Sequence, residues 1–550
     1  MALPPARTTR LLYSSIGVCL AVMSAYLAVR IRSFDVASFT IPGLITATCL
    51  LAAELFVAFH GMGYLASIVK ATRARERAHT PMLAPYTSSP VAVLIASFNE
   101  SEEVLEETLA SASAMDYPDF QIYLLDDSTR EENRLIAARV AGRYRARLIT
   151  RRNRAGYKAG AINDLLPSLT EPFIAVLDAD QRPIHSWLRE IVPQLEADPS
   201  LAFVQAPQVY VNHDGKPVAL AAFFQQAVFY EYICEGKNAS NAMFCCGSNV
   251  VLRREALLSI GRDVDGRRHY FDETSITEDF ATSLRLHAHG WTSRYVNRTY
   301  VVGMGPETLA AYFTQQTRWA MGTVGVFRKM LRYFATDPRS LTAGQWWEYF
   351  LSGNYYFIGF MNFLFMVASV GFLVFGIRPV HMSASVYLAL FVPYFAFSFG
   401  VFLVGMRVRN YPFTGTWIGT ALAFGGWWTF MRAAITAALT AKQTFSVTPK
   451  GTGGKVPLKG LIPQVTMFGL CCLAVISGLL HIVLDERFDL TYVVTASWAA
   501  YHAALTGTLL FYFNQPVTIH PRQPVFEPVA GLPMPASSGR AFTRPIEEAA

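Results

Sequence analysis

Long apolar runs lie near both ends of the chain, whereas the middle mixes apolar and polar residues as a water-soluble domain does. The first runs cover residues 11–29 and 41–69. Because about 20 apolar residues cross a bilayer as a helix, each run predicts a membrane span. The later candidate spans are residues 346–376, 383–405, 465–484 and 490–513. The pattern predicts a multi-pass membrane protein with a soluble domain between two sets of transmembrane helices.

Within the middle, apolar runs alternate with helical patterns. Residues 91–96 form a continuous, β-branched apolar run, which is typical of a strand buried in a parallel sheet. Residues 102–114 show helical spacing with acidic residues in the first turn. Further strands are predicted over residues 121–125 and 173–177. This alternation predicts an α/β domain with a mostly parallel sheet and flanking helices.

The stretch 417–439 is ambiguous. It contains Arg432 and several Gly and Thr residues, so we expect an amphipathic helix on the membrane interface rather than a span. The tail is rich in Pro and small residues and is predicted to be disordered. The expected organisation is two transmembrane helices in 1–70, the soluble domain in 71–340, two helices in 341–410, the interfacial region in 411–463, two helices in 464–514 and the tail in 515–550.

Charge placement predicts the orientation of the chain. The net charge is +7, and basic residues cluster before the first span and after the second. Cytoplasmic flanks of spans are rich in Lys and Arg, so we expect a cytoplasmic soluble domain and no role in nucleic-acid binding. A second span follows the first at once, which favours a retained helix over a cleaved signal peptide. The seven cysteines form no CxxC, so neither a zinc site nor a disulfide framework is indicated.

Acidic residues follow two of the predicted strands, where ligands of open α/β sheets bind. Asp178 and Asp180 form a DxD, and two such carboxylates can hold Mg²⁺ or Mn²⁺ against a diphosphate. Asp126 and Asp127 follow the earlier strand and could hold a nucleotide. Asp279, in Thr-Glu-Asp before a helical run, could act as a general base or simply cap that helix.

A Gln-x-x-Arg-Trp segment comes next. The spacing places Gln315 and Arg318 on one helix face. Arg can pair with a diphosphate through two parallel hydrogen bonds, and Trp319 can stack on a sugar ring.

Two other clusters of basic residues are not interpreted as binding sites for a regulator or a metal. Arg151, Arg152 and Arg154 are interpreted as solvated surface or phosphate steering, and His287 and His289 as helix surface.

Taken together, these elements resemble the D, DxD, (T/E)ED, QxxRW signature of the processive family-2 glycosyltransferases. The segment Ser97-Phe98-Asn99-Glu100 resembles the nucleotide-binding turn, residues 158–163 the KAGxxN segment, and residues 244–248 the FFCGS motif. Residues 445–451 look like the FxVTxKG gating loop of bacterial cellulose synthase catalytic subunits. Two residues depart from the pattern, Cys245 in FFCGS and Pro449 in the loop.

The resemblance implies roles for individual residues. Catalytic roles fall on Asp279, Glu278 and Asp127, and metal binding falls on Asp178 and Asp180. Substrate-binding roles fall on Ser97, Glu100, Asp126, Lys158, Cys246, Gly247, Ser248, Gln315, Arg318, Trp319, Phe445, Val447, Thr448 and Lys450.

The resemblance also implies a GT-A-type fold in the bacterial inner membrane and an inverting reaction. The expected reaction is polymerisation of glucose from UDP-glucose into a cellulose-like β-1,4-glucan, which the chain translocates. Alternatives are β-1,3 or mixed linkage as in curdlan, a chitin- or hyaluronan-type product, transfer of one sugar to a lipid, or a non-enzymatic channel or scaffold. Expected partners are the UDP-sugar, the growing polysaccharide, the lipid bilayer and a periplasmic accessory subunit. The tail of about 35 residues predicts no cyclic-di-GMP-binding PilZ domain.

Overall fold

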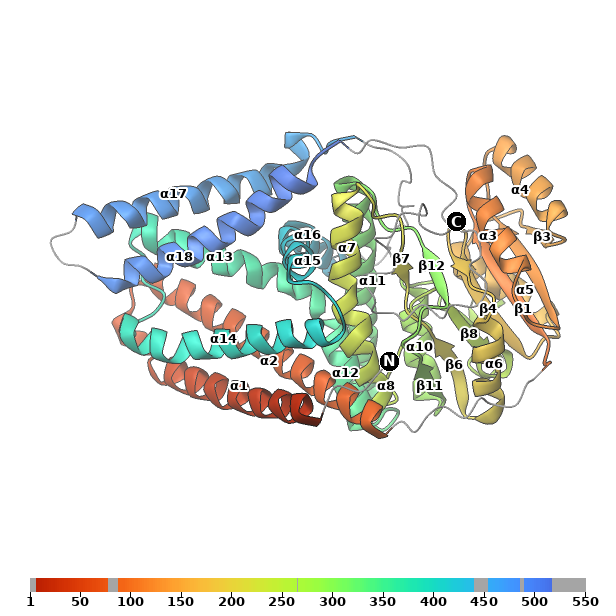
Figure 1. Cartoon of the computed structure of the whole chain (residues 1–550), viewed down its shortest axis with the longest axis horizontal. Helices are drawn as coiled ribbons and strands as arrows, with labels where there is room; N and C mark the ends of the chain where they lie inside the picture. Colours follow the sequence, from red (N-terminus) through yellow and green to blue (C-terminus); the bar gives the residue numbers. More distant parts are fainter. Residues whose placement is uncertain (1–5, 78–87, 265, 440–453, 485–488, 517–550) are drawn as a thin grey trace, which may run out of the picture.

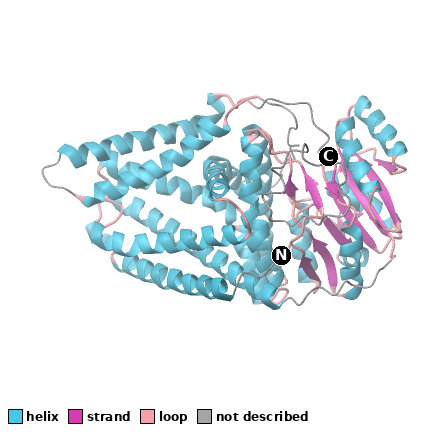
Figure 2. Cartoon of the chain, viewed as in Figure 1, coloured by secondary structure: helices cyan, strands magenta, loops and turns pink. Residues whose placement is uncertain are grey.

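The computed structural model describes residues 6–77, 88–264, 266–439, 454–484 and 489–516 of the chain (Figure 1). The stretch expected to form the gating loop, residues 445–451, and nearly all of the tail lie outside the described residues. Strands gather at one end of the molecule and long helices at the other (Figure 2). The soluble domain and the membrane bundle are therefore spatially separate, as the apolar pattern predicts.

The soluble domain is built on a seven-stranded mixed sheet of order β11-β6-β8-β4-β1-β2-β3. In it, β1 is parallel to both β2 and β4, whereas β8 is antiparallel to β4 and β6. The predicted α/β fold is confirmed. The strands are β1 (Val91–Ser97), β2 (Phe120–Asp126), β3 (Arg147–Thr150), β4 (Phe173–Asp178), β6 (Leu201–Gln205), β8 (Val250–Arg253) and β11 (Thr292–Tyr295).

Helices cover both faces of this sheet, which explains why its central strand is apolar throughout. Val93 and Ile95 of β1 pack against Leu109 of α3 on one face. Leu94, between them, packs against Ile162 of α5 on the other face. Side chains alternate along a strand, so a strand buried on both faces is a continuous apolar run. The covering helices include α3 (Glu102–Ser113), α4 (Glu131–Arg143), α5 (Tyr157–Leu165), α6 (Trp187–Ala197), α9 (Arg254–Ser259) and α10 (Glu278–Ala288).

Two small sheets extend the domain, one of β5 (Arg182–Pro183), β12 (Val301–Gly303) and β7 (Val209–Tyr210), the other of β9 (Arg262–Val264) and β10 (Arg267–His269).

The register of the main sheet positions the site. Ser97 is level with Asp126, and Ala96 with Asp178. The carboxyl ends of β1, β2 and β4 therefore meet at one edge.

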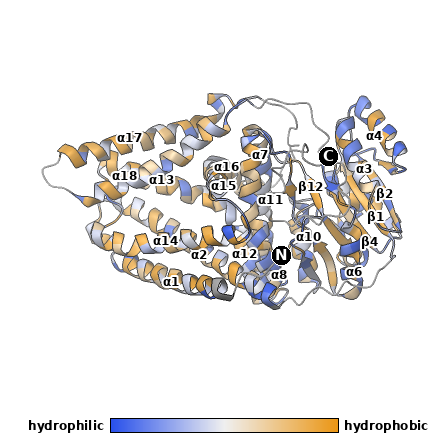
Figure 3. Cartoon of the chain, in the orientation of Figure 1, coloured by the Kyte–Doolittle hydropathy of each residue, from blue (hydrophilic) through white to orange (hydrophobic). Residues whose placement is uncertain are grey.

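The membrane bundle contains long apolar helices that run side by side (Figures 1 and 3). Within the described residues, five segments are long and apolar enough to cross a membrane: Thr9–Arg32, Ile41–Glu76, Ala343–Phe375, Ala384–Val408 and Leu458–Leu484. The expected sixth segment is α18, which packs on α17 but falls short of the same criteria. The helices are α1 (Ala6–Arg32), α2 (Ile41–Arg77), α12 (Ala343–Gly353), α13 (Ile358–Phe375), α14 (Ala384–Val408), α17 (Ile462–Leu484) and α18 (Leu490–Gly507).

Helices that run across the bundle direction lie between the bundle and the sheet (Figure 1). The stretch expected to form one interfacial helix comprises two helices, α15 and α16, which pack on α7 and α11 respectively. They are separated at Gly425-Gly426, where two glycines in succession weaken a helix. The helices of this layer are α7 (Pro217–Val228), α8 (Cys234–Ala239), α11 (Leu309–Thr336), α15 (Phe413–Gly425) and α16 (Trp427–Leu439).

Candidate active site

A cavity of about 870 Å³ runs from the strand ends of the soluble domain to the membrane helices. Asp127 and Asp178 line its sheet end, whereas His60 and Tyr64 of α2 line its membrane end. Between them lie the first turn of α10 and one face of α11. Of the predicted site residues, the structure brings together around this cavity Ser97, Glu100, Asp127, Lys158, Asp178, Asp180, Cys246, Gly247, Glu278, Asp279, Gln315, Arg318 and Trp319.

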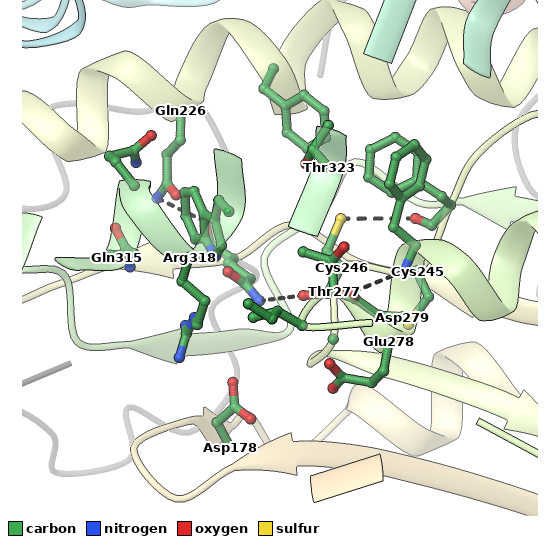
Figure 4. Close-up of a pocket in the computed structure, with 18 of the residues that line it drawn as sticks. Asp178, Gln226, Cys245, Cys246, Thr277, Glu278, Asp279, Gln315, Arg318 and Thr323 are labelled. Atoms are coloured by element: carbon green, nitrogen blue, oxygen red, sulfur yellow. Dashed lines mark hydrogen bonds between the residues drawn. The ribbon is translucent and has the colours of Figure 1, made fainter. Parts of the chain in front are cut away.

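The DxD lies at the end of β4. The backbone N–H of Asp178 donates to Ser248 Oγ at 3.0 Å, and Lys158 Nζ binds both the Asp178 carboxylate and the Gly247 carbonyl oxygen, the latter at 2.7 Å. The Asp178 side chain is 44% exposed, so it remains accessible from the cavity. Asp178, Glu278 and Arg318 point into one shared space (Figure 4).

Asp178 and Asp180 fit a hard divalent cation. Carboxylate oxygens are the ligands that Mg²⁺ and Mn²⁺ prefer. Nowhere in the described part of the chain do three or more His, Cys, Asp or Glu side chains gather as a metal-binding group. A cation held at this DxD would therefore need further oxygen ligands, and a diphosphate and water supply them.

Asp279 lies in the first turn of α10, with its carboxylate fixed on two sides. Its Oδ1 accepts a hydrogen bond from the Phe280 N–H at 2.8 Å. On the other side is Gly247, whose φ of +83° lies in the left-handed region and whose Cβ, if present, would be 2.9 Å from Asp279 Oδ2. Glycine is therefore required here by both conformation and space.

The electrostatics of the site suit proton transfer near neutral pH. Burial and the charge of Glu278 raise the pKa of Asp279 to about 7, although the Phe280 N–H and Lys158 oppose the shift. Burial also raises the pKa of Glu278. Burial lowers the pKa of Lys158, but the negative charges of Asp178, Glu278 and Asp279 together with the hydrogen bond to Asp178 outweigh burial, so the net pKa is raised. A base with a pKa near the working pH is efficient.

Helix α11 forms the facing wall of the cavity. Gln315, Arg318 and Trp319 line it, and Gln315 Nε2 donates to the Tyr210 hydroxyl at 3.3 Å. One turn further, Gly322 allows close approach to the loop before Asp279. A Cβ at Gly322 would lie 2.5 Å from Thr277 Cγ2 and 2.9 Å from its backbone nitrogen. The Arg318 helix and the Asp279 loop are thus held in direct contact.

Two predicted substrate-binding residues lie beneath the cavity rather than in its wall. Asp126 is 4% exposed, accepts a hydrogen bond from Ser128 Oγ at 2.6 Å, and has a pKa raised chiefly by burial. Ser248 is fully buried and supports the Asp178 backbone. The other four, Phe445, Val447, Thr448 and Lys450, lie outside the described residues.

Arg152 and His289 are exposed, as the sequence predicts, but the interpretation is wrong for Arg151 and for His287. Arg151 is not solvated, because its side chain is 7% exposed and its guanidinium binds the carboxylates of Asp127 and Asp164. His287 is not on the helix surface. It is buried, with ring nitrogens 2.7 Å from the Tyr349 hydroxyl and 2.9 Å from Ser293 Oγ. Both acquire partners that are distant in sequence, which local spacing cannot reveal.

Some residues that line the cavity belong to none of the sequence motifs and were not predicted as site residues. Tyr210 lies in the short strand β7, and His60 and Tyr64 lie in an apolar membrane helix. A polar His in such a helix is the available signal, since ionisable residues within membrane helices commonly mark pathways or sites.

Comparison with known proteins shows which proteins the chain resembles. Residues 173–404 match the model described as Glycosyl transferase family group 2. The cellulose synthase catalytic subunit [UDP-forming] of Pseudomonas fluorescens is 27% identical over 81% of this chain and 59% of its own length. Putative cellulose synthase 2 of Komagataeibacter xylinus is 28% identical over 78% of this chain and 28% of its own length.

The chain thus spans 59% and 28% of the lengths of these two relatives. Among solved structures, the mannosyltransferase PcManGT from Pyrobaculum calidifontis, in complex with GDP-Man and Mn²⁺, aligns with a TM-score of 0.46 and 18% identity over 71% of this chain and 99% of its own. The sequence matches thus make the chain similar to family-2 glycosyltransferases and to cellulose synthase catalytic subunits, and its mixed sheet with flanking helices is a GT-A-like fold.

Proposed function

We propose that this chain is a processive, inverting β-glycosyltransferase that polymerises glucose from UDP-glucose into a β-1,4-glucan and moves it across the membrane. The observation that carries the proposal is the cavity itself. It reaches from Asp178 at the sheet edge past Asp279 and Trp319 to His60 in a membrane helix. An enzyme that transfers a single sugar to a water-soluble acceptor has no need for an active site that opens into its membrane bundle, and the size of the product distinguishes polymerisation from transfer of one sugar to a lipid.

The chain's own residues supply the steps of transfer. Asp178 and Asp180 would hold Mg²⁺ or Mn²⁺, which neutralises the charge of a diphosphate leaving group when bound. Arg318, which faces Asp178, would bind the same diphosphate. Asp279 takes the proton from the acceptor hydroxyl as that oxygen attacks the anomeric carbon. One direct displacement inverts this carbon, so an α-linked donor gives a β-linkage.

Aromatic and polar side chains continue along the cavity beyond the base. Trp319 and Tyr355 line it, as do Tyr64 and His60 of α2. Aromatic faces stack on the apolar faces of sugar rings, while hydroxyl and imidazole groups bind sugar hydroxyls. This lining fits a chain of sugars passed from the base toward the bundle, and the added sugar at each cycle would drive the movement.

The proposed location is the bacterial inner membrane, with the soluble domain cytoplasmic and the polymer released to a periplasmic accessory subunit. Introduced cysteines test this, after removal of the native ones. Cysteine at Glu132, exposed on α4, should react with an impermeant thiol reagent only from the cytoplasmic side. Cysteine at Ser385, exposed near the start of α14, should react only from outside. The reverse labelling would overturn the orientation.

The gating segment is proposed from its sequence alone. Phe445, Val447 and Thr448 would close over the donor while Lys450 helps to hold its diphosphate. Closure of a loop excludes water and completes a site. Phe445→Ala should therefore lose most synthesis while UDP still binds, and normal synthesis in this variant would remove the gating role.

Polymer synthesis by the purified full chain in lipid nanodiscs is the decisive experiment. Radiolabelled UDP-glucose should give a high-molecular-weight product with Mg²⁺ or Mn²⁺, degraded by a β-1,4-glucanase and resistant to a β-1,3-glucanase. The reverse digestion pattern would show that the linkage is β-1,3 and not β-1,4. Product formed from UDP-N-acetylglucosamine but not from UDP-glucose would show that the polymerised sugar is N-acetylglucosamine. A single lipid-linked sugar would show that the enzyme is not processive. Asp279→Asn is the inactive control.

A further inference from the structure

One helical run, made of α7, a π-helical segment and α8, has the cavity on one side and the ends of two membrane helices on the other. The π-helix spans Phe229–Ile233 and is continuous with α7 before it and α8 after it. A π turn holds more residues than an α turn, so it redirects the side chains around it, and such segments are frequent at functional sites. Phe229, Tyr230 and Ile233 line the cavity and form its inner wall.

The side chains between these residues face the membrane helices instead. Glu231 and Tyr232 are buried and lie outside the cavity lining in the described part of the chain. The Tyr232 hydroxyl donates to the backbone carbonyl oxygen of Gly405, in the last turn of α14, at 2.7 Å. The guanidinium of Arg409, which directly follows α14, lies 4.7 Å from the centroid of the Tyr232 ring. The segment that carries the inner wall is therefore bonded to a membrane helix.

Two carboxylates strengthen this junction. Glu231 accepts from the Tyr411 hydroxyl at 3.2 Å and lies 3.5 Å from Arg409. Glu235, one turn further along the run, accepts from Arg409 at 2.9 Å and from Arg75, in the last turn of α2, at 3.0 Å. Arginines at the ends of two membrane helices, α2 and α14, thus bind neighbouring carboxylates of the soluble domain.

The soluble domain adds a further donor to both carboxylates. Asn297, in the loop after β11, donates to Glu231 at 2.9 Å and to Glu235 at 2.7 Å. The side chains of Glu231 and Glu235 are only 3% and 11% exposed. Carboxylates that are buried and bonded in this way are not available to a substrate, and they fix the elements that supply their donors.

We propose that Glu231 and Tyr232 are positioning residues that hold the inner wall in line with the membrane helices, and so keep a growing polymer bound between additions. This rests on the proposed function in that the product passes from the soluble domain into the bundle. Such a product touches the inner wall and, further along the cavity, α2. Binding to two linked surfaces is strong only while both stay aligned, so a loose junction releases the polymer early. Asp178 and Asp279 belong to β4 and α10, so transfer itself should be less affected.

Product length and initial rate, measured on the full chain in nanodiscs, separate this role from chemistry. Tyr232→Phe removes one hydroxyl and keeps the ring, whereas Glu231→Gln removes the charge that faces Arg409. Each should shorten the mean polymer about 5-fold, the factor by which one lost hydrogen bond changes an equilibrium. The initial rate of UDP release should stay close to that of the wild type. Hydrogen exchange at residues 405–411 should rise in both variants, because their anchor to the soluble domain is weakened.

Glu190→Gln is the matched control. Glu190 is likewise bound by an arginine and by a tyrosine hydroxyl, those of Arg298 and Tyr300, but all three residues belong to the soluble domain. Its substitution should lower the melting temperature and leave both the product length and the exchange at residues 405–411 unchanged.

Several results would overturn the proposal. Wild-type product length in both junction variants would remove their role in retaining the polymer, and unchanged exchange would remove the junction itself. Equal losses of rate and length would place the effect on transfer, and a shorter product from Glu190→Gln would place it on general stability. The wild-type polymer assay reports on the proposed function separately. Raised exchange in Glu231→Gln but not in Glu190→Gln, in a protein whose wild type makes no polymer, supports the positioning role and overturns polymerisation.

Discussion

The ends of β2 and β4 carry similar acidic sequences but have different environments. At the end of β2, Asp126 is 4% exposed and bonded to Ser128, and Asp127 is bound by Arg151. At the end of β4, Asp178 is 44% exposed and faces the cavity. The strands flank β1 in level register. An acid at a strand end therefore identifies the edge where chemistry takes place, but its partners decide whether it supports the edge or acts there.

The largest effect on polymer synthesis is expected from substitution of Asp279, the proposed base. Asp279→Asn keeps an oxygen that can accept from the Phe280 N–H, so the local geometry should survive. It removes the proton acceptor, which is worth about 10²–10⁴-fold in rate. Polymer synthesis should fall by that factor, with UDP affinity close to the wild type by calorimetry. Synthesis within a few-fold of the wild type would exclude Asp279 as the base.

Substitution at the two strand ends tests the contrast itself. Asp127→Asn removes one of the two carboxylates that bind the buried Arg151, and because Asp164 remains, the loss should be about 2 kcal/mol of unfolding free energy. Asp178→Asn removes an accessible carboxylate and should leave stability nearly unchanged while metal-dependent UDP binding is lost. Thermal unfolding and calorimetry on the same samples measure both quantities.

The matched control for this pair is the double variant Asp127→Asn, Arg151→Met. It removes the buried cation together with the carboxylate that binds it and should recover much of the lost stability. Failure to recover would mean that Asp127 has a role beyond pairing with Arg151. Equal loss of UDP binding in the Asp127 and Asp178 variants, at unchanged stability, would remove the distinction between the two strand ends.

A smaller effect is expected where the helix of Arg318 touches the loop of Asp279. Gly322→Ala places a Cβ 2.5–2.9 Å from Thr277 side-chain and backbone atoms, so the loop must shift. A shift of tenths of an ångström should lower the turnover number about 10-fold, since displacement by 1 Å can cost about 100-fold. The control is Gly142→Ala on α4, where a Cβ meets nothing within 4 Å. Turnover should not change there, and equal effects at both sites would contradict the positioning role.

The sequence predicts the sheet and its active edge because both depend on local pattern. A strand buried on both faces must be apolar throughout, as residues 91–96 are, and the acids at the ends of β2 and β4 follow such runs directly. The α/β domain and the long membrane helices could therefore be predicted from short windows of sequence.

The interaction partners of individual polar side chains could not be predicted in the same way. Whether Arg151 is solvated depends on Asp127, on another strand, and whether His287 is buried depends on Tyr349, which is 62 residues away. The membrane end of the cavity depends on His60, whose helix meets the active site only after folding. Such facts follow from packing between distant elements, and sequence spacing does not encode them separately.

The smallest expected effect is a change in the pH dependence of synthesis. Asp279 must be ionised to accept a proton, and its pKa is raised to about 7 by burial and by Glu278. The turnover number should therefore rise with pH through about 7 and level off above it. Glu278→Gln removes a negative charge that favours the protonated form of Asp279, so the midpoint should move to lower pH even if the maximum rate also falls. Asp127→Asn at the other strand end should leave the midpoint in place. A profile flat from pH 5 to 9, or a midpoint that Glu278→Gln moves upward, would show that a group other than Asp279 controls the rate.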